Sequence, residues 1–275
     1  MAELCLGLAT SHLAHIVNAR DAGDPAKVAA FDAGYTRLAT ALRDAALDVS
    51  LIVSAEHVNK FFIDNMPAFC MGLFDSFAGP VEGRTRDVGY PWREVPSDPE
   101  LARYLIERGL DEGVDWAVSE FWEVDHGMMV PLHKLDPEGC VPMIPVFVNC
   151  ASAPMPSARR CFAVGRWLAD AIADWPTSKR VGIVATGGLS HSVGTLDQGR
   201  IDAGFDEWFL DRLCAGDGEA LAGLGDARMM AAGSSTGEVR SWIVLAGAFA
   251  GRRAERVFYA PIEGFDTGCA QAVYR

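Results

Sequence analysis

The feature that most limits the possible folds of this chain is the alternation of short apolar runs with longer amphipathic stretches. The short runs are typical of buried strands, and the longer stretches repeat their apolar positions with helical spacing. The expected strands are 4–9, 49–55, 143–148, 180–186 and 255–262, and the expected helices are 24–45, 99–113, 157–175, 197–216, 219–224 and 235–251. Strands that alternate with helices form a sheet covered by helices. The sequence therefore predicts an α/β fold: one layered domain, residues 1–275, with a central mixed sheet flanked by helices.

Length and charge exclude several classes of partner. The chain of 275 residues suits one large domain with a substantial core, and half of its residues are hydrophobic. Its formal net charge of −13 gives a surface that repels nucleic acid phosphates and anionic membranes. The longest apolar runs are shorter than the roughly 20 residues that a membrane helix needs. We therefore expect no nucleic acid partner and no membrane partner.

The N-terminal segment and the cysteines indicate a cellular compartment. The start, "MAELCLGLATSHLAH", has no basic residues before its apolar stretch and so is unlike a signal peptide. The seven cysteines are scattered and never spaced as C-x-x-C, which is typical of reduced thiols rather than of a cysteine zinc site. We expect a cytoplasmic protein.

One long stretch, residues 70–98, breaks the alternating pattern. It is rich in glycine, proline and aromatic residues and has weak periodicity. Loops of this length in compact domains often act as lids or binding loops. We expect this loop to line a pocket or a subunit interface, and its Arg84, Arg86 and Arg93 could supply an anchor for a substrate carboxylate.

Three of the six histidines directly follow predicted strands: His12, His57 and His191. In α/β sheets the ligand site lies beyond the carboxyl ends of the strands, so these three side chains are expected to converge on one crevice. A single histidine after a strand is often only a turn residue, but three such positions favour a shared site. His15 and His133 follow no predicted strand, and we interpret them as supporting or surface residues.

His191 lies in "TGGLSHS" (186–192), where two glycines allow a sharp turn at the end of a buried strand. The same stretch nearly matches the G-x-S-x-G turn of α/β-hydrolases, with Ser190 as nucleophile and Ser192 in place of the second glycine. That arrangement needs a histidine later in the chain, and none follows His191. The hydrolase order is therefore excluded.

A carboxylate would decide what the histidines could hold, and the candidate is Glu238 in "SSTGEVRSW". Ser235 and Glu238 have the spacing of a capping box, in which the glutamate would reach back to the Ser235 amide. The same glutamate shares one helix face with Trp242, Leu245 and Phe249, and a carboxylate on a buried face needs a cation or a hydrogen-bonding partner. Spacing alone leaves the cap and the metal ligand as equal alternatives.

An ordered set of motifs covers nearly the whole chain and resembles the class III (LigB-type) ring-cleaving extradiol dioxygenases. The motifs are, in chain order, "SHLAH", "AEHVNKFF", "NMPAFCMG", "VDHGMMVPL", "PVFVN", "ATGGLSHS", "GEVRSW" and "GFDTGCAQAVY". No single motif decides the matter, whereas their order along the chain is a strong signal.

The resemblance implies a mononuclear non-heme iron(II) centre, Fe(II), with His12, His57 and Glu238 as ligands. Two histidines and one carboxylate form a facial set that leaves positions open for an ortho-diol and for dioxygen. It also implies that His191 is an acid–base residue near the metal and that His126, in "VDHGMMVPL", is a second catalytic histidine beside the substrate. We further assign Asp125 and Gly188 to substrate binding.

The implied reaction is meta-cleavage of a catecholic or related ring with insertion of both atoms of O2. His191 would remove a proton from the diol, and His191 or His126 would assist later proton transfers, since imidazole titrates near neutral pH. The chain departs from the family pattern at Glu56, where an aspartate is expected before the second histidine ligand. This change could alter how His57 is oriented.

Two other functions remain open from the residues alone: a non-catalytic interaction protein with a LigB-like fold, and a zinc-dependent hydrolase that uses the same ligands. The aromatic diol, or a related heterocycle, and O2 are the expected small-molecule partners. We expect a homo-oligomer, with or without a small second subunit. The sequence indicates neither the particular substrate nor the ring bond that is cleaved.

Overall fold

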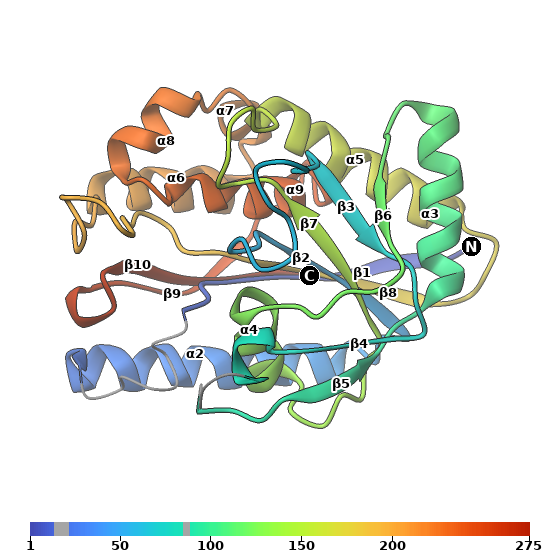
Figure 1. Ribbon diagram of the computed structural model, residues 1–275, viewed down its shortest axis with the longest axis horizontal. Helices are drawn as coiled ribbons and strands as arrows, with labels where there is room; N and C mark the ends of the chain where they lie inside the picture. The colour runs from blue at the N-terminus through green and yellow to red at the C-terminus, as the bar shows by residue number, and fades with distance from the viewer. Residues whose placement is uncertain (14–21, 85–88) are drawn as a thin grey trace.

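The computed structural model describes residues 1–13, 22–84 and 89–275, and not the side chain of Arg84 (Figure 1). Eight strands form one sheet in the order β6-β3-β7-β2-β8-β1-β10-β9, and β4 pairs with β5 in a separate two-stranded sheet. The strands are β1 (Glu3–Thr10), β2 (Val49–Ser54), β3 (Phe69–Gly72), β4 (Ser76–Gly79), β5 (Arg93–Pro96), β6 (Ala117–Ser119), β7 (Met143–Val148), β8 (Arg180–Thr186), β9 (Glu255–Ile262) and β10 (Thr267–Tyr274).

The sheet is mixed, as expected. Strands β7, β2, β8 and β1 are parallel neighbours, while β3 runs antiparallel to β7 and β10 runs antiparallel to both β1 and β9. The four parallel strands end at the same edge of the sheet, because parallel strands share one direction. The loops that follow β1, β2 and β8 therefore begin side by side.

Helices cover both faces of the sheet, so the α/β prediction of a single sheet flanked by helices is confirmed. In Figure 1, α2 and α4 lie below the sheet, and α5, α6, α8 and α9 lie above it. The helices and short 3-10 turns are α2 (Pro25–Asp44), α3 (Pro99–Glu112), α4 (His126–Leu135), α5 (Ala158–Asp174), α6 (Ala203–Ala215), α7 (Gly218–Ala222), α8 (Asp226–Ala232), α9 (Val239–Ala248), η2 (Val81–Arg84), η3 (Thr236–Glu238) and η4 (Glu263–Phe265).

Two hydrophobic clusters hold these layers together, one on each face. Side chains alternate between the faces of a strand. Ile183 of β8 accordingly belongs to the cluster under α5 and α9, and its neighbour Val184 belongs to the cluster under α2 and α4. This double burial explains why the central strands are continuous apolar runs rather than alternating ones.

Local signals explain where the well-predicted helices begin and end. Asp24 accepts hydrogen bonds from the amides of Ala26 and Lys27, and Pro25 occupies the first position of α2. Asp98 caps α3 in the same way, and Gly113 ends that helix with a φ of +80°.

The structure corrects several expected boundaries. Residues 197–202 are not helical, because Asp202 caps the amide of Phe205 and α6 begins only at Ala203. The expected helix at 235–251 starts as the 3-10 turn η3 and continues as α9. Strand β9 is not the last strand, since β10 follows it and pairs with β1. Elements β6, α4 and α8 were not expected.

The expected loop at 70–98 contains more regular structure than its composition indicates. It begins within β3, which belongs to the main sheet, and it includes β4, β5 and the turn η2. Each of these strands has four residues, which is too short to show a period. None of the helices in the described ranges is long and apolar enough to cross a bilayer.

Candidate metal centre and active site

Four imidazoles and one carboxylate meet at the edge where the parallel strands end. His12 follows β1, His57 follows β2 and His191 follows β8, so three neighbouring central strands each deliver one ring. Glu238 ends the turn η3, and His126 is the first residue of α4. The expected convergence of the three histidines that follow strands is therefore observed.

Three of these side chains form a compact triangle of potential ligand atoms. Nε2 of His12 lies 3.3 Å from Nε2 of His57 and 3.5 Å from Oε2 of Glu238. Nε2 of His57 lies 3.4 Å from Oε1 of Glu238. A triangle of this size allows one ion to contact both Nε2 atoms and the carboxylate at about 2.0–2.2 Å, the usual range for metal bonds to imidazole and carboxylate.

Nδ1 of both His12 and His57 is held by a protein partner, which directs Nε2 of each ring toward this triangle. Nδ1 of His57 lies 2.9 Å from Oδ2 of Asp125, which can only accept, so Nδ1 carries the proton. Nδ1 of His12 lies 3.1 Å from the hydroxyl of Thr186, and that hydroxyl donates to the carbonyl of Gly127 at 2.8 Å. The Thr186 oxygen therefore accepts from His12. Such partners orient metal-binding histidines.

The other two histidines are held through the same ring atom. Nδ1 of His191 donates to the carbonyl of Leu189 at 2.9 Å, which leaves Nε2 facing Oε1 of Glu238 at 3.6 Å. Nδ1 of His126 donates to Oε1 of Glu82 at 2.8 Å. The His126 ring lies 4.1 Å from the His57 ring, centroid to centroid. Both rings thus border the triangle without forming part of it.

A second possible ligand group exists, because His126 also has a ring nitrogen within 4.8 Å of those of His12 and His57. We favour Glu238 as the third member for two reasons. One of its oxygens lies 3.5 Å from Nε2 of His12, and the other lies 3.4 Å from Nε2 of His57. It is also a carboxylate with 6 % of its surface exposed, and a buried negative charge needs a cation.

The electrostatics of the site favour an ionised carboxylate among imidazoles. Burial alone would raise the pKa of Glu238, but the surrounding imidazoles hold it well below its usual value. Burial lowers the pKa of His12 to about 3, so this ring is neutral and its Nε2 is free to bind a metal. Burial also acts to lower the pKa of His191, but the Glu238 carboxylate overcomes it and the net shift is upward.

Glu238 does not serve as the expected capping residue. Its Oε2 accepts a hydrogen bond of 2.8 Å from the amide of Gly188, whereas the Ser235 amide donates to the carbonyl of His191. The Ser235 side chain caps no helical amide in the described part of the chain. The capping-box interpretation is therefore wrong, because the turn η3 directs the carboxylate toward the histidines.

The glycines of "TGGLSHS" are required by the geometry of this turn. Gly187 has a φ of +151°, which side-chain-bearing residues rarely adopt. A Cβ atom on Gly188 would lie 2.8 Å from Cε1 of His191, so the ring occupies the space that a side chain would need. The turn can therefore present His191 only if position 188 has no side chain.

Asp125 and Gly188, which the sequence assigns to substrate binding, both have protein partners in the structure. Asp125 is 1 % exposed, and its Oδ2 accepts from both the amide and Nδ1 of His57, while Oδ1 accepts from the amide of Gly127. The Gly188 amide donates to Glu238. In these contacts Asp125 orients the His57 ring, and the Gly188 amide holds the Glu238 carboxylate.

The departure at Glu56 leaves His57 well oriented. The Glu56 carboxylate accepts hydrogen bonds from the amides of Asn59, Lys60 and Phe61, so it closes the loop after β2. Asp125, which comes from another segment, supplies the carboxylate that holds the His57 ring. The longer side chain at position 56 therefore changes the local turn and not the partner of the imidazole.

The expected arginine anchor is not supported by Arg93. Its guanidinium donates to the backbone carbonyls of Leu132, Asp136 and Pro137, so it ties β5 to the end of α4. The side chain of Arg84 and all of Arg86 lie outside the described residues, as does His15. His133 lies outside the site, with its ring against that of Tyr90.

Two residues that hold the site were not found from the sequence. Glu82 lies in the turn η2, within the weakly patterned segment, and its bond to His126 has no signature in spacing. Thr186 ends β8 and could have been suspected, since it immediately precedes the glycine turn.

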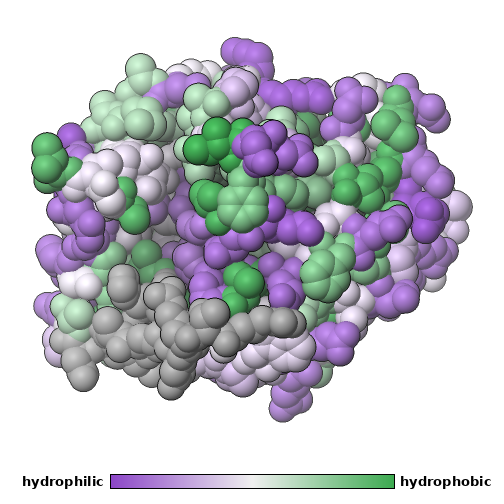
Figure 2. All heavy atoms as spheres, viewed as in Figure 1, coloured by the Kyte–Doolittle hydropathy of each residue, from purple (hydrophilic) through white to green (hydrophobic). Residues whose placement is uncertain are grey.

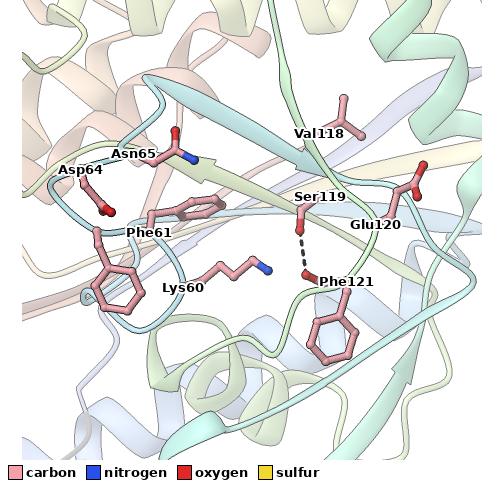
Figure 3. Close-up of a pocket in the computed structure, with 9 residues that line it drawn as sticks. Lys60, Phe61, Asp64, Asn65, Val118, Ser119, Glu120 and Phe121 are labelled. Atoms are coloured by element: carbon pink, nitrogen blue, oxygen red, sulfur yellow. Dashed lines mark hydrogen bonds between the residues drawn. The ribbon is translucent and has the colours of Figure 1, made fainter.

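A cavity of about 490 Å³ opens between two segments that both lead to the site (Figure 3). One wall, residues 60–65, follows His57, and the other, residues 118–121, leads toward His126. Figure 3 shows the Lys60 side chain extending toward Ser119 and Phe121, and its Nζ lies 5.6 Å from the Phe121 ring centre. Apolar residues are exposed at the surface here, over the loop between β2 and β3 (Figure 2).

Comparisons with known proteins show the family of the chain. The family model for the catalytic LigB subunit of aromatic ring-opening dioxygenase matches residues 6–267. A Photorhabdus laumondii protein named 2,3-dihydroxyphenylpropionate/2,3-dihydroxicinnamic acid 1,2-dioxygenase is 28% identical, over 86% of this chain and 87% of that protein. A Pseudomonas putida protein of the same name, numbered 1, is 31% identical, over 82% of this chain and 85% of that protein.

A solved structure shares the fold. The crystal structure of an uncharacterized protein from Escherichia coli K12 superposes with a TM-score of 0.61, at 16% identity, over 98% of this chain and all of that chain. This likeness bears on architecture alone.

The fold and the site together define a ring-opening enzyme built around a group of histidines and a carboxylate that can hold a metal ion. The chain belongs to the LigB family of catalytic subunits of aromatic ring-opening dioxygenases. It is an extradiol ring-cleavage dioxygenase, and an aromatic compound and O2 are its substrates.

Proposed function

We propose that His12, His57 and Glu238 hold one iron(II) ion and that the protein cleaves a catecholic ring by the extradiol route. The observation that carries this proposal is the triangle of two Nε2 atoms and one carboxylate, with mutual distances of 3.3–3.5 Å. Two imidazoles and a carboxylate suit ferrous iron, whereas a thiolate would favour other metals. Bound there, iron supplies open coordination positions and the electron transfer that allow dioxygen to react with an ortho-diol.

His191 is proposed as the residue that exchanges protons with the diol. Its Nδ1 is committed to the carbonyl of Leu189, so Nε2 is the atom that accepts and returns the proton. The ring is 5 % exposed, which limits exchange with bulk water. His126, held by Glu82, is proposed as the second proton-transfer residue, on the side of the His57 ring.

The proposed substrate is a catechol that carries a side chain ending in a carboxylate. Two observations support this class. The two relatives named above act on 2,3-dihydroxyphenylpropionate and 2,3-dihydroxycinnamic acid, according to their names. The cavity between the segments that follow His57 and precede His126 combines the rings of Phe61, Phe62 and Phe121 with the ammonium group of Lys60. Aromatic walls suit a phenyl side chain, and an ammonium group suits a carboxylate.

The test begins with metal-free protein that is loaded anaerobically with iron(II) or zinc. Each form receives catechol, 2,3-dihydroxyphenylpropionate, an aminophenol and O2, and the ring-opened product is followed by absorbance. Iron-dependent consumption of one O2 per ring, with both oxygen atoms of ¹⁸O2 in the product, is the expected result. Zinc-dependent hydrolysis without O2 uptake would contradict the proposal, and so would inactivity of the iron-loaded protein with every diol.

The proposed assembly is a homo-oligomer, on the strength of the exposed apolar side chains of Phe62, Ile63 and Phe121 around the mouth of the cavity. Contiguous apolar surface of this kind often marks a protein interface. Light scattering on the purified protein would measure the assembly, and a monomer at all concentrations would contradict it.

A further inference from the structure

A second buried carboxylate, Asp206, lies near the proposed acid–base residue and has no part in the metal triangle. It belongs to the first turn of α6 and has no exposed surface. Its partners are one amide and two hydroxyl groups: the amide of Ser190 at 2.8 Å, the hydroxyl of Ser190 at 2.8 Å and the hydroxyl of Tyr259 at 3.0 Å. A buried carboxylate is costly, so this arrangement calls for a reason.

Asp206 accepts hydrogen bonds from Ser190, in the turn that carries His191. Ser190 directly precedes His191, and both of its donors, the amide and the hydroxyl, go to Asp206. Its hydroxyl also accepts from the amide of Asp202, and its carbonyl accepts from the amide of Gly268. Every polar group of Ser190 therefore has a hydrogen-bonding partner, and Asp206 accepts hydrogen bonds from both of its donors.

Leu189 connects Ser190 to the imidazole of His191. The Leu189 carbonyl accepts from Nδ1 of His191, and the Leu189 amide donates to the carbonyl of Gly268. Leu189 and Ser190 are thus held by hydrogen bonds from two elements: Asp206 of α6 binds Ser190, and Gly268 of β10 binds both residues. The orientation of Nε2 of His191 therefore depends on the position of Leu189 and Ser190.

Position 268 shows how closely the carboxylate fits. A Cβ atom on Gly268 would lie 1.9 Å from Oδ2 of Asp206, so the carboxylate fills the space over the strand. An amide could not replace it without loss. If the amide oxygen in Asp206→Asn accepted from the Ser190 amide, its NH2 group would face the hydroxyls of Ser190 and Tyr259, which donate to the carboxylate in the native protein.

We propose that Asp206 is a positioning residue for the reaction, which acts by fixing the Leu189–Ser190 turn and thereby aiming Nε2 of His191. This inference rests on the proposed acid–base role of His191. Asp206 touches neither the metal triangle nor the cavity, so its loss is expected to leave metal content and KM unchanged while kcat falls.

The test is a double-mutant cycle between Asp206→Asn and His191→Ala in the iron-loaded enzyme, with Glu207→Gln as control. Glu207 lies on the same helix and is exposed, where it pairs with Arg256, so the control makes the same chemical change away from the turn. Asp206→Asn is expected to lower kcat about 10- to 100-fold. In the His191→Ala background the same change is expected to have no further effect, because residues that act as a unit are not additive.

Each outcome separates this inference from the proposed function. An impaired His191→Ala with a fully active Asp206→Asn would overturn the inference alone, as would an additive loss in the double variant or a loss of iron in Asp206→Asn. Full turnover in His191→Ala would overturn the proposed role of His191, and the inference with it. If Asp206→Asn does not fold, Ser190→Ala takes its place in the same cycle, since it removes the hydroxyl that donates to Asp206.

Discussion

The carboxylate of Glu82 accepts a hydrogen bond of 2.8 Å from Nδ1 of His126, and this bond joins the segment after β4 to the N-terminus of α4. The bond orients the His126 ring against that of His57, where the ring centroids are 4.1 Å apart. The segment 70–98 therefore contributes to the site through an acidic residue, and not through the arginines that its sequence brings to attention.

Glu82→Ala is expected to lower kcat about 10-fold and to leave the iron content unchanged, because His126 would lose its orientation while the metal triangle stays whole. Steady-state kinetics and metal analysis of the same preparation would measure both quantities. Glu82→Gln should have a smaller effect, since its amide oxygen can still accept from Nδ1. Loss of iron in the alanine variant would place His126 among the metal ligands and contradict the assignment of Glu238.

Glu238→Ala is expected to abolish retention of iron after desalting. The variant removes one corner of the triangle and the acceptor of the Gly188 amide. Ser235→Ala is the matched control, since the Ser235 side chain caps no amide among the described residues, and it should keep its iron. Stoichiometric iron in Glu238→Ala would show that another residue completes the site.

His191→Ala is expected to bind iron and substrate and to lose about 10²–10⁴-fold in kcat, the usual contribution of one placed proton-transfer group. Gly188→Val should produce a similar loss with the imidazole still present, because its Cβ would lie 2.8 Å from Cε1 of His191. Single-turnover kinetics with metal analysis would follow both variants. An iron-free His191→Ala would make this histidine a ligand and remove one of the other three from the metal.

Lys60→Gln is expected to raise KM for 2,3-dihydroxyphenylpropionate about 10-fold and to change KM for catechol little. An ammonium group that binds a carboxylate contributes only when the substrate carries one. The measurement is the ratio of the two KM values, with Lys134→Gln as a control, since that lysine pairs with Asp32 away from the cavity. Equal changes for both substrates would remove Lys60 from substrate recognition.

The stability of the protein should depend on pH through Asp206. Burial raises the pKa of Asp206 to about 6, from an ordinary value of 3.8, and Asp202 adds to this shift while Ser190 and Tyr259 oppose it. A raised folded-state pKa means that the folded protein holds the proton more tightly. The protonated Asp206 side chain therefore contributes fully to the free energy of unfolding below about pH 4, and this contribution is lost as the pH rises through about 6.

Relative to Asp206→Asn, the native protein should therefore lose on the order of 2 kcal/mol of unfolding free energy between pH 4 and pH 7. Urea unfolding of both proteins at several pH values would give the difference, in which the titration of the shared histidines cancels. Parallel stability curves for the two proteins would show that Asp206 has an ordinary pKa in the fold.

The sequence predicts best the elements that are buried on both faces. Strands such as β2, β7 and β8 are continuous apolar runs and were placed within one residue of their observed ends. Strand β10 was missed because "TGCAQAVY" includes Gln271, which is fully buried and donates to the carbonyl of Phe31. Helix α4 was missed because Pro131 lies within it and its apolar residues show no clear stripe.

The same limit applies to the candidate site. His12, His57 and His191 follow strands, so the parallel order of the sheet was enough to bring them together. The bonds that orient them are long-range, and nothing in the spacing joins Glu82 to His126 or Asp125 to His57. The role of Asp125 as the cap of α4 and the partner of His57 was not predicted, because only its neighbour in sequence, His126, carries a visible signal.

The first and last strands meet beside the metal triangle. Ser11, the residue before His12, donates from its amide to the carbonyl of Ala270 and accepts at its hydroxyl from the amide of Ala270. On the ribosome, these contacts cannot form until the C-terminal strand has emerged. The backbone support of His12 is therefore completed only late in synthesis, once β10 has been made and can pair with β1.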